Sequence, residues 1–73
     1  MKSLVDLKVG ESGKVTSFEN QGVAKKRLLD MGITTGVTVK LVKIAPLGDP
    51  IEIEVRGFNL SLRKSEAKNI KIN

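Results

Sequence analysis

Two alternating segments, IEIEV at residues 51–55 and FNLSL at residues 58–62, constrain the fold more than any other feature. Only Arg56 and Gly57 separate them, and two alternating runs joined by two residues predict a tight β-hairpin. In this register all inward pairs are apolar, namely Val55 with Phe58, Ile53 with Leu60, and Ile51 with Leu62. The pattern therefore assigns Phe58 to the core and makes the other face of the hairpin the solvent face.

The segment VTVKLVKI, residues 37–44, changes its apolar parity partway along. Its apolar residues fall on two parities: Val37, Val39 and Leu41 on one, Val42 and Ile44 on the other. Such a change predicts a β-bulge, because one extra residue exchanges the two faces of a strand. We place this bulge near Leu41. Antiparallel pairing with residues 51–55 then aligns Ile44 with Ile51, Lys43 with Glu52, Lys40 with Glu54, and Val39 with Val55.

The segment NQGVAKKRLLDMGI, residues 20–33, predicts a helix. Asn20 is a suitable N-cap, and the inward stripe is Ala24, Leu28 and Met31. Gly32 occupies the position of a left-handed C′ residue, and Ile33 follows at C″, where it can fold back onto Leu28. This order of residues predicts a Schellman stop.

The remaining elements are short. An apolar turn (Leu4, Val5, Leu7) precedes a first strand at residues 15–18, and a last strand is expected at residues 70–72. Ser65 in SEAKN is the expected cap of a single helical turn. Five strands, one helix and one helical turn predict a mainly β single domain over residues 1–73. An SH3-like barrel is the favoured architecture, with an OB-type barrel as the alternative.

Composition removes most catalytic chemistry. The 73 residues include neither Cys nor His, so thiolate ligands, the commonest general base and the commonest metal ligand are absent. We therefore expect no enzyme activity and no cofactor. Thirteen Lys and Arg against eight Asp and Glu give a net charge of +5, which favours acidic partners. The basic residues are spread along the chain, and KKR at residues 25–27 is their only run.

Three carboxylates lie close together at Asp49, Glu52 and Glu54. The two glutamates share the outer face of a strand opposite lysines, so cross-strand ion pairs are the favoured interpretation. Asp49 is expected to cap its own turn before Pro50. A weak exposed metal site at the three carboxylates stays open as an alternative, although Mg²⁺ or Ca²⁺ would need several converging oxygens and Fe²⁺ generally prefers at least one imidazole or thiolate.

The first residues predict no export signal, because Asp6 and Lys8 stand where a signal peptide needs an apolar block. No apolar stretch approaches the ~20 residues that span a bilayer. We expect a soluble intracellular protein without direct membrane insertion.

Several segments resemble the FeoA family of ferrous iron transport accessory proteins. The most specific are Met31-Gly32-Ile33, the loop PLGDP at residues 46–50, the Gly57 hairpin and the closing LRKSEAKNIKI. The sequence departs mildly from the family at Thr35-Gly36, where Pro-Gly is commoner, and at Lys64, where Arg is common. The resemblance implies a cytoplasmic SH3-like barrel that works with FeoB, a membrane Fe²⁺ transporter with a cytoplasmic GTP-binding domain.

On this basis the chain is expected to be a protein-binding module that docks on FeoB. The proposed contact residues are Lys25 and Lys26 on the helix and Pro46 and Leu47 at the loop tip. The alternatives are a nucleic-acid-binding barrel, suggested by the net charge, and a weak Fe²⁺ binder that uses the three carboxylates described above. Scattered lysines and the lack of exposed aromatic residues argue against nucleic acid. The sequence leaves the oligomeric state open.

Overall fold

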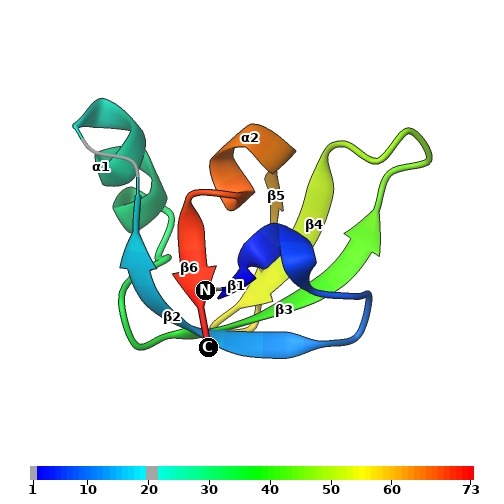
Figure 1. Cartoon of the computed structure of the whole chain (residues 1–73), viewed down its shortest axis with the longest axis horizontal. Coiled ribbons are helices and arrows are strands. Elements are labelled where there is room, and N and C mark those ends of the chain that lie inside the picture. The colour runs from blue at the N-terminus through cyan, green and yellow to red at the C-terminus, as the bar shows by residue number, and fades with distance from the viewer. Residues whose placement is uncertain (1, 20–21) are drawn as a thin grey trace.

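The computed structural model describes residues 2–19 and 22–73, in which six strands form one antiparallel sheet in the order β1-β6-β2-β3-β4-β5 (Figure 1). The strands are β1 (Lys2–Ser3), β2 (Ser12–Phe18), β3 (Thr38–Ile44), β4 (Ile51–Val55), β5 (Phe58–Leu62) and β6 (Ile70–Ile72). The helices are the 3₁₀ turn η1 (Leu4–Asp6), α1 (Val23–Asp30) and α2 (Lys64–Ala67). The mainly β prediction is confirmed. The structure has one strand more than the five predicted, namely the two-residue β1, which pairs with β6.

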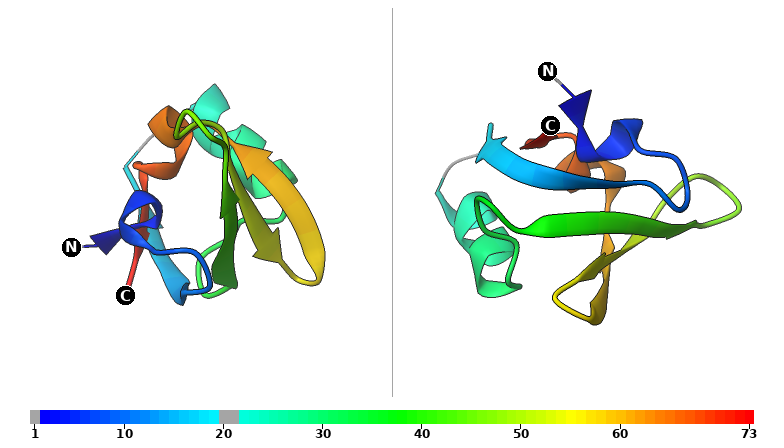
Figure 2. Two further views of the ribbon diagram at one scale, coloured as in Figure 1. Left: turned by 90° about the vertical axis from the view of Figure 1, so that its right-hand side faces the viewer. Right: turned by 90° about the horizontal axis from the view of Figure 1, so that it is seen from below.

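Strand β2 joins the two halves of the curled sheet (Figure 2). Its first residues pair with β3 and its last residues pair with β6, with a register shift between Val15 and Ser17. The strand begins at Ser12, three residues before the predicted start at Val15. Gly13 belongs to the strand through its pairing with Val39 of β3. Glycine fits there because Ile72 of β6 lies close by: a Cβ at Gly13 would be 2.8 Å from Ile72 Cδ1.

The predicted bulge in β3 is confirmed. Lys40 and Leu41 pair with Glu54 and Ile53, whereas Lys43 and Ile44 pair with Glu52 and Ile51. Val42 is therefore the extra residue, and the strand changes face across it. The resulting bend lets one strand contribute to both ends of the core.

The β4–β5 register is also as predicted, from Val55 opposite Phe58 to Ile51 opposite Leu62. Arg56 and Gly57 both have positive φ, at 54° and 84°, as a type I′ turn requires. The assignment of Phe58 to the core is wrong, because its side chain is 71% exposed. Phe58 lies at the turn end of an edge strand, where the inner face of the sheet extends past the packed core.

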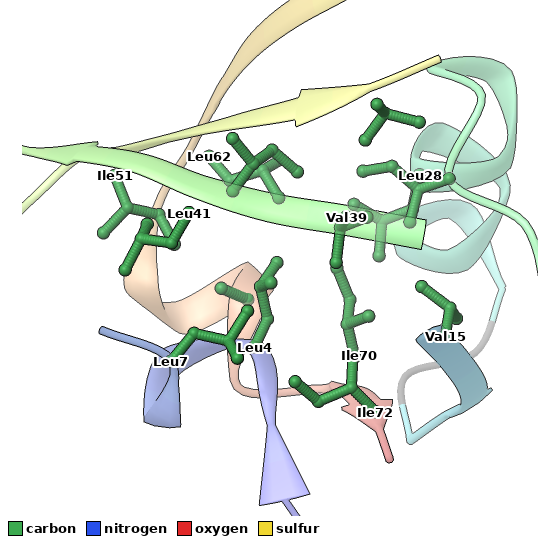
Figure 3. Close-up of a cluster of buried hydrophobic side chains, with 14 residues drawn as sticks. Leu4, Leu7, Val15, Leu28, Val39, Leu41, Ile51, Leu62, Ile70 and Ile72 are labelled. Atoms are coloured by element: carbon green, nitrogen blue, oxygen red, sulfur yellow. The ribbon is translucent and has the colours of Figure 1, made fainter. Parts of the chain in front are cut away.

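Buried apolar side chains from the strands and the helices form one core (Figure 3). They are Leu4, Leu7, Val15, Leu28, Ile33, Val39, Leu41, Ile51, Ile53, Val55, Leu62, Ala67, Ile70 and Ile72. Strands β3, β4 and β5 lie on one side of this core, and η1, α2 and β6 lie on the other. Each buried Leu, Ile or Val contributes about 1.5–3 kcal/mol relative to an exposed one. The outer face of the sheet and the edge of β5 are left for contacts with other molecules.

The end of α1 is the predicted Schellman stop. Gly32 has φ 91°, its N–H donates to Leu29 O over 3.0 Å, and the Ile33 N–H donates to Leu28 O over 3.1 Å. Leu28 and Ile33 are both buried, and Met31 packs partly against the core. The proposed N-cap Asn20 and the side chain of Ala24 lie outside the described residues.

Helix α2 does not use Ser65 as its cap. Arg63 is the N-cap, so Ser65 lies inside the helix. The Arg63 N–H donates to Glu66 Oε1 over 3.2 Å, which satisfies a donor just before the first turn. Strand β5 ends only one residue before this cap, so the helix starts earlier than the serine suggests.

Candidate protein-docking site

The acidic strand β4 lies in the predicted register, but it forms no ion pairs there. Glu52 and Glu54 are half-buried on the outer face, opposite Lys43 and Lys40. Salt bridges among the described side chains join other partners, Arg27 with Glu66 and Lys71 with Glu19. The predicted register is therefore confirmed, but the predicted cross-strand ion pairs are wrong. Residues can lie opposite one another in the ladder while their long side chains turn away into solvent.

Asp49 does not cap its own turn. Its Oδ1 accepts a hydrogen bond from the main-chain N–H of Lys64 over 2.9 Å, so the loop before β4 is tied to the first turn of α2. No group of three Asp, Glu, His or Cys side chains suited to a metal ion occurs among the described residues. Asp49 thus has a structural partner, and the two glutamates of β4 have no third carboxylate beside them.

Among residues 2–19 and 22–73, two carboxyl groups have perturbed pKa values, and each is held by a hydrogen bond. The Ser3 N–H donates to Asp6 Oδ2 over 2.9 Å, and this bond lowers the pKa of the Asp6 carboxyl. A hydrogen bond from the Lys71 ammonium lowers the pKa of the Glu19 carboxyl. Both groups favour the charged form, which is the opposite of a carboxyl poised as a general acid.

The basic helix patch, Lys25 and Lys26, is exposed on α1. Lys25 Nζ lies 5.8 Å from the centre of the Phe18 ring, close enough for a cation–π contact that holds the lysine over the end of β2. Lys26 points to solvent beside a shallow hollow that it shares with Arg27, Asp30 and Met31. The patch presents positive charge from a defined helix.

The loop tip, Pro46 and Leu47, projects between β3 and β4. Leu47 is 96% exposed, the largest exposure among the described large apolar side chains. Two main-chain bonds hold the base of the loop: the Gly48 N–H donates to Ala45 O over 2.7 Å, and the Ala45 N–H donates to Pro50 O over 3.1 Å. The apolar tip is therefore presented by a fixed loop.

The structure does not bring these predicted contact residues together. Helix α1 lies at one end of the longest axis and the β3–β4 loop lies at the other (Figure 1). The molecule measures 30 Å along this axis. A partner that touches both patches must therefore span the whole domain.

Beside the end of α1 lies a surface that the sequence did not reveal. A cavity of about 420 Å³, here called the apolar groove, separates the end of α1 from the start of β5. Its lining includes Asp30, Met31, Arg56, Phe58, Asn59 and Leu60. The inward parity of Phe58 was the only signal in the sequence, and it pointed to the core.

A second cavity, of about 290 Å³, lies at the other end of β5 and is called here the polar cavity. It is lined by Arg27, Asp49, Ser61, Arg63 and Glu66, among others. Arg27 Nη1 lies 3.5 Å from Glu66 Oε2, so one of its two arginines is paired. The edge of β5 thus runs from the apolar groove to the polar cavity.

The family described as FeoA domain matches residues 2–73. The Fe(2+) transport protein A/Fe(2+) transporter FeoB fusion protein of Porphyromonas gingivalis is 36% identical over 69 residues, which cover 94% of this chain and 8% of the fusion protein. The chain therefore corresponds to less than a tenth of that relative's length.

Solved structures show the same fold. The FeoA protein of Chlorobium tepidum is 38% identical with a TM-score of 0.90, and the match covers 97% of this chain and 68% of that one. The Stenotrophomonas maltophilia FeoA, solved with zinc and described as a procaryotic SH3 domain protein, is 27% identical with a TM-score of 0.87, over 100% and 91% of the two chains. The predicted SH3-like architecture is confirmed. No described helix is long and apolar enough to cross a membrane.

Proposed function

The chain belongs to the FeoA family, and we propose that it is a cytoplasmic accessory protein of ferrous iron uptake that docks on the cytoplasmic region of an FeoB-type transporter. The FeoA family is one of non-catalytic accessory proteins, so the chain is not an enzyme. Its contribution to transport is then made through contact with the protein that moves the ion.

The observation that carries this proposal is the fusion protein. In Porphyromonas gingivalis a segment 36% identical to this chain is joined to an FeoB transporter in one polypeptide. A covalent link holds two domains at high effective concentration, which is useful where they meet repeatedly.

We assign the contact to the two exposed patches. The basic helix patch supplies Lys25 and Lys26, and the loop tip supplies Pro46 and Leu47. Lysines at the rim of an interface speed association through long-range attraction, whereas an apolar side chain gains more from burial. The distance between the patches favours a partner surface that extends along the whole domain.

Nuclear magnetic resonance titration tests the assignment. The labelled chain is mixed with the cytoplasmic region of FeoB, and we expect the amide signals of both patches to move. The paired changes Lys25→Glu and Lys26→Glu should weaken binding at least about tenfold. The matched control is Lys8→Glu with Lys14→Glu, two exposed lysines outside the patches, and it should change affinity much less. Unmoved amide signals at Lys25, Lys26 and Leu47 would remove this assignment; Pro46 has no N–H and gives no amide signal.

Leu47→Ser tests the loop tip in the same way. Val9→Ser is its control, because Val9 is also exposed and apolar but lies in the loop before β2. We expect only the Leu47 change to lower affinity for FeoB, since the loop tip is the proposed contact. Equal losses in both variants would mean that general surface hydrophobicity drives the association.

Nucleic acid and Fe²⁺ are tested as the competing ligands. The exposure of Phe58 beside Arg56 removes one argument against nucleic acid, which can stack on exposed aromatic rings. We still favour protein, and expect filter binding at low salt to show no sequence-independent affinity in the micromolar range. Anaerobic calorimetry with Fe²⁺ checks the carboxylates: micromolar binding lost on the paired changes Glu52→Gln and Glu54→Gln would establish the ion as a ligand.

A further inference from the structure

The outer edge of β5 carries hydrogen-bonding groups that no strand of the described chain uses. Strand β5 ends the sheet and pairs only with β4 there. In a two-residue hairpin the pair that closes the turn, Val55 with Phe58, is hydrogen-bonded, and the bonding alternates along the ladder. Asn59 and Ser61 therefore turn their N–H and C=O groups away from β4. Both residues are exposed.

Strand β5 itself carries none of the usual edge protection, and helix α1 faces it across the apolar groove and the polar cavity. Proteins commonly block an exposed strand edge with proline, with lysine, with a bulge or with a covering element. Strand β5, FNLSL, contains no proline and no charged residue, and it pairs with β4 without a register shift. Its two outward residues are small and neutral. The edge is thus suited to pairing with another extended chain.

The two cavities beside the edge indicate which side chains an added strand would carry. Asn59 lines the apolar groove, and Ser61 lines the polar cavity. Met31 and Phe58 also line the groove, and offer apolar surface to one incoming side chain. A strand that lies along β5 would therefore place an apolar residue at the start of β5 and a polar or charged residue at its end.

The two ends of the edge are positively charged. Arg56 borders the apolar groove and Arg63 borders the polar cavity, and both are exposed. Neither forms a salt bridge with any side chain in the described part of the chain. The acidic groups of the polar cavity already have partners: Glu66 pairs with Arg27, and Asp49 accepts the Lys64 amide. Asp30 at the groove is the remaining carboxylate.

We propose that an extended segment of the docking partner adds to β5 as a further strand. The segment carries an apolar residue that enters the groove at Met31 and Phe58, and carboxylates that reach Arg56 and Arg63. Arg56 lies in the turn before β5 and Arg63 directly follows β5, so a segment that pairs along the five residues of β5, about 13 Å at roughly 3.3 Å per residue, ends near both arginines. That the partner is FeoB rests on the proposed function. The mode of contact rests on β5 alone.

A second copy of the chain is a poorer occupant. The antiparallel register that pairs Asn59 with Ser61 of another copy also places Arg63 opposite Gly57 of that copy. Arg56 of the second copy then lies next to Arg63 of the first, and symmetry repeats this at the other end. Like charges brought together across a strand pair oppose association. An acidic segment meets the same two arginines favourably.

Amide hydrogen exchange in the wild-type chain tests the proposal directly. In the free protein the outward amides of Asn59 and Ser61 should exchange fast, whereas Leu60, bonded to β4, is protected. Binding of the FeoB cytoplasmic region should slow exchange at Asn59 and Ser61 at least about tenfold. If FeoB binds and these two amides keep their free rates, strand addition is wrong and the proposed function stands. If FeoB does not bind at all, both are wrong.

A pair of substitutions at Ser61 separates main chain from side chain. Ser61→Pro removes an N–H that β4 does not use, and proline is tolerated on an edge strand at such a position. Ser61→Ala keeps the N–H and removes the hydroxyl. Strand addition predicts at least about tenfold weaker binding for the proline variant and less than about twofold for the alanine variant. Equal losses in the two variants would contradict it. The exchange measurement decides the matter if Ser61→Pro does not fold.

Discussion

Asp49 Oδ1 lies 2.9 Å from the main-chain nitrogen of Lys64 and accepts its hydrogen bond. This bond links the loop before β4 to the first turn of α2, fifteen residues further along the chain. The Lys64 N–H is one of the donors that a helix leaves without an internal partner. The most conspicuous carboxylate of the loop therefore holds two elements together beside the polar cavity.

Replacing Asp49 should lower stability through this bond. Asp49→Ala is expected to reduce the free energy of unfolding by about 0.5–1 kcal/mol, because the Lys64 N–H loses its acceptor and only water replaces it. Asp49→Asn keeps an acceptor oxygen and should lose less than the alanine variant. Urea denaturation of both variants measures the difference. Equal stability of Asp49→Ala and the wild type would show that the bond contributes nothing.

Gly32 should be replaceable only at a cost in stability. Its φ of 91° disfavours any residue with a Cβ, although nothing lies within 4 Å of where that Cβ would be. We expect Gly32→Ala to cost about 1 kcal/mol and Gly32→Val more, because the strain is in the backbone and a branched side chain increases it. In a domain of this size, 1 kcal/mol lowers Tm by roughly 4–8 °C. An unchanged Tm in Gly32→Val would contradict the assigned stop.

Gly13 cannot be replaced freely because of a steric clash, not because of its φ, and a double substitution tests this. The Cβ of an alanine there would lie 2.8 Å from Ile72 Cδ1 and 3.2 Å from Asn73 O. Gly13→Ala should therefore destabilise β2 against β6, and Ile72→Val alone should cost about 0.5–1.5 kcal/mol. Together they should cost less than the sum, because valine lacks Cδ1. Thermal unfolding of the four proteins gives the coupling, and strict additivity would exclude the steric explanation.

Asp6 should make stability depend on pH. The Ser3 N–H holds the pKa of Asp6 below its unfolded value near 3.8, so the folded state favours the carboxylate. The stabilisation is fully present above the unfolded pKa and is lost as pH falls through the lower folded pKa. Asp6→Ala should be less stable than the wild type at pH 6, and the gap should narrow toward about pH 3. Chemical denaturation at several pH values checks this. A constant gap would rule out Asp6 as the titrating group.

The features that could be predicted from the sequence are those that depend on a few neighbouring residues. The bulge at Val42 could be predicted because a parity change has few other causes in a strand. The helix end at Gly32 could be predicted because few residues other than glycine adopt that backbone conformation. Both follow from rules that concern only a few neighbouring residues.

Predictions from the sequence were poorer where the environment of a residue depends on contacts with distant parts of the chain. Parity places Phe58 on the inner face, but it does not tell whether another element covers that face at the turn. Asp49 finds its partner in α2, whereas the local rule assigns it to its own turn. Strand β1 has two residues and therefore no alternation to detect. The apolar groove could not be predicted either, because its walls come from α1 and β5, which lie far apart in the sequence.

The central claim, that this chain docks on FeoB, is tested most directly by isothermal titration calorimetry. The full chain is titrated into the isolated cytoplasmic region of an FeoB transporter from the same organism. The account predicts saturable one-to-one binding in the micromolar range, and weaker binding at higher salt because the contact uses Lys25, Lys26, Arg56 and Arg63. Absence of saturable heat at low salt, with both proteins folded, would contradict it.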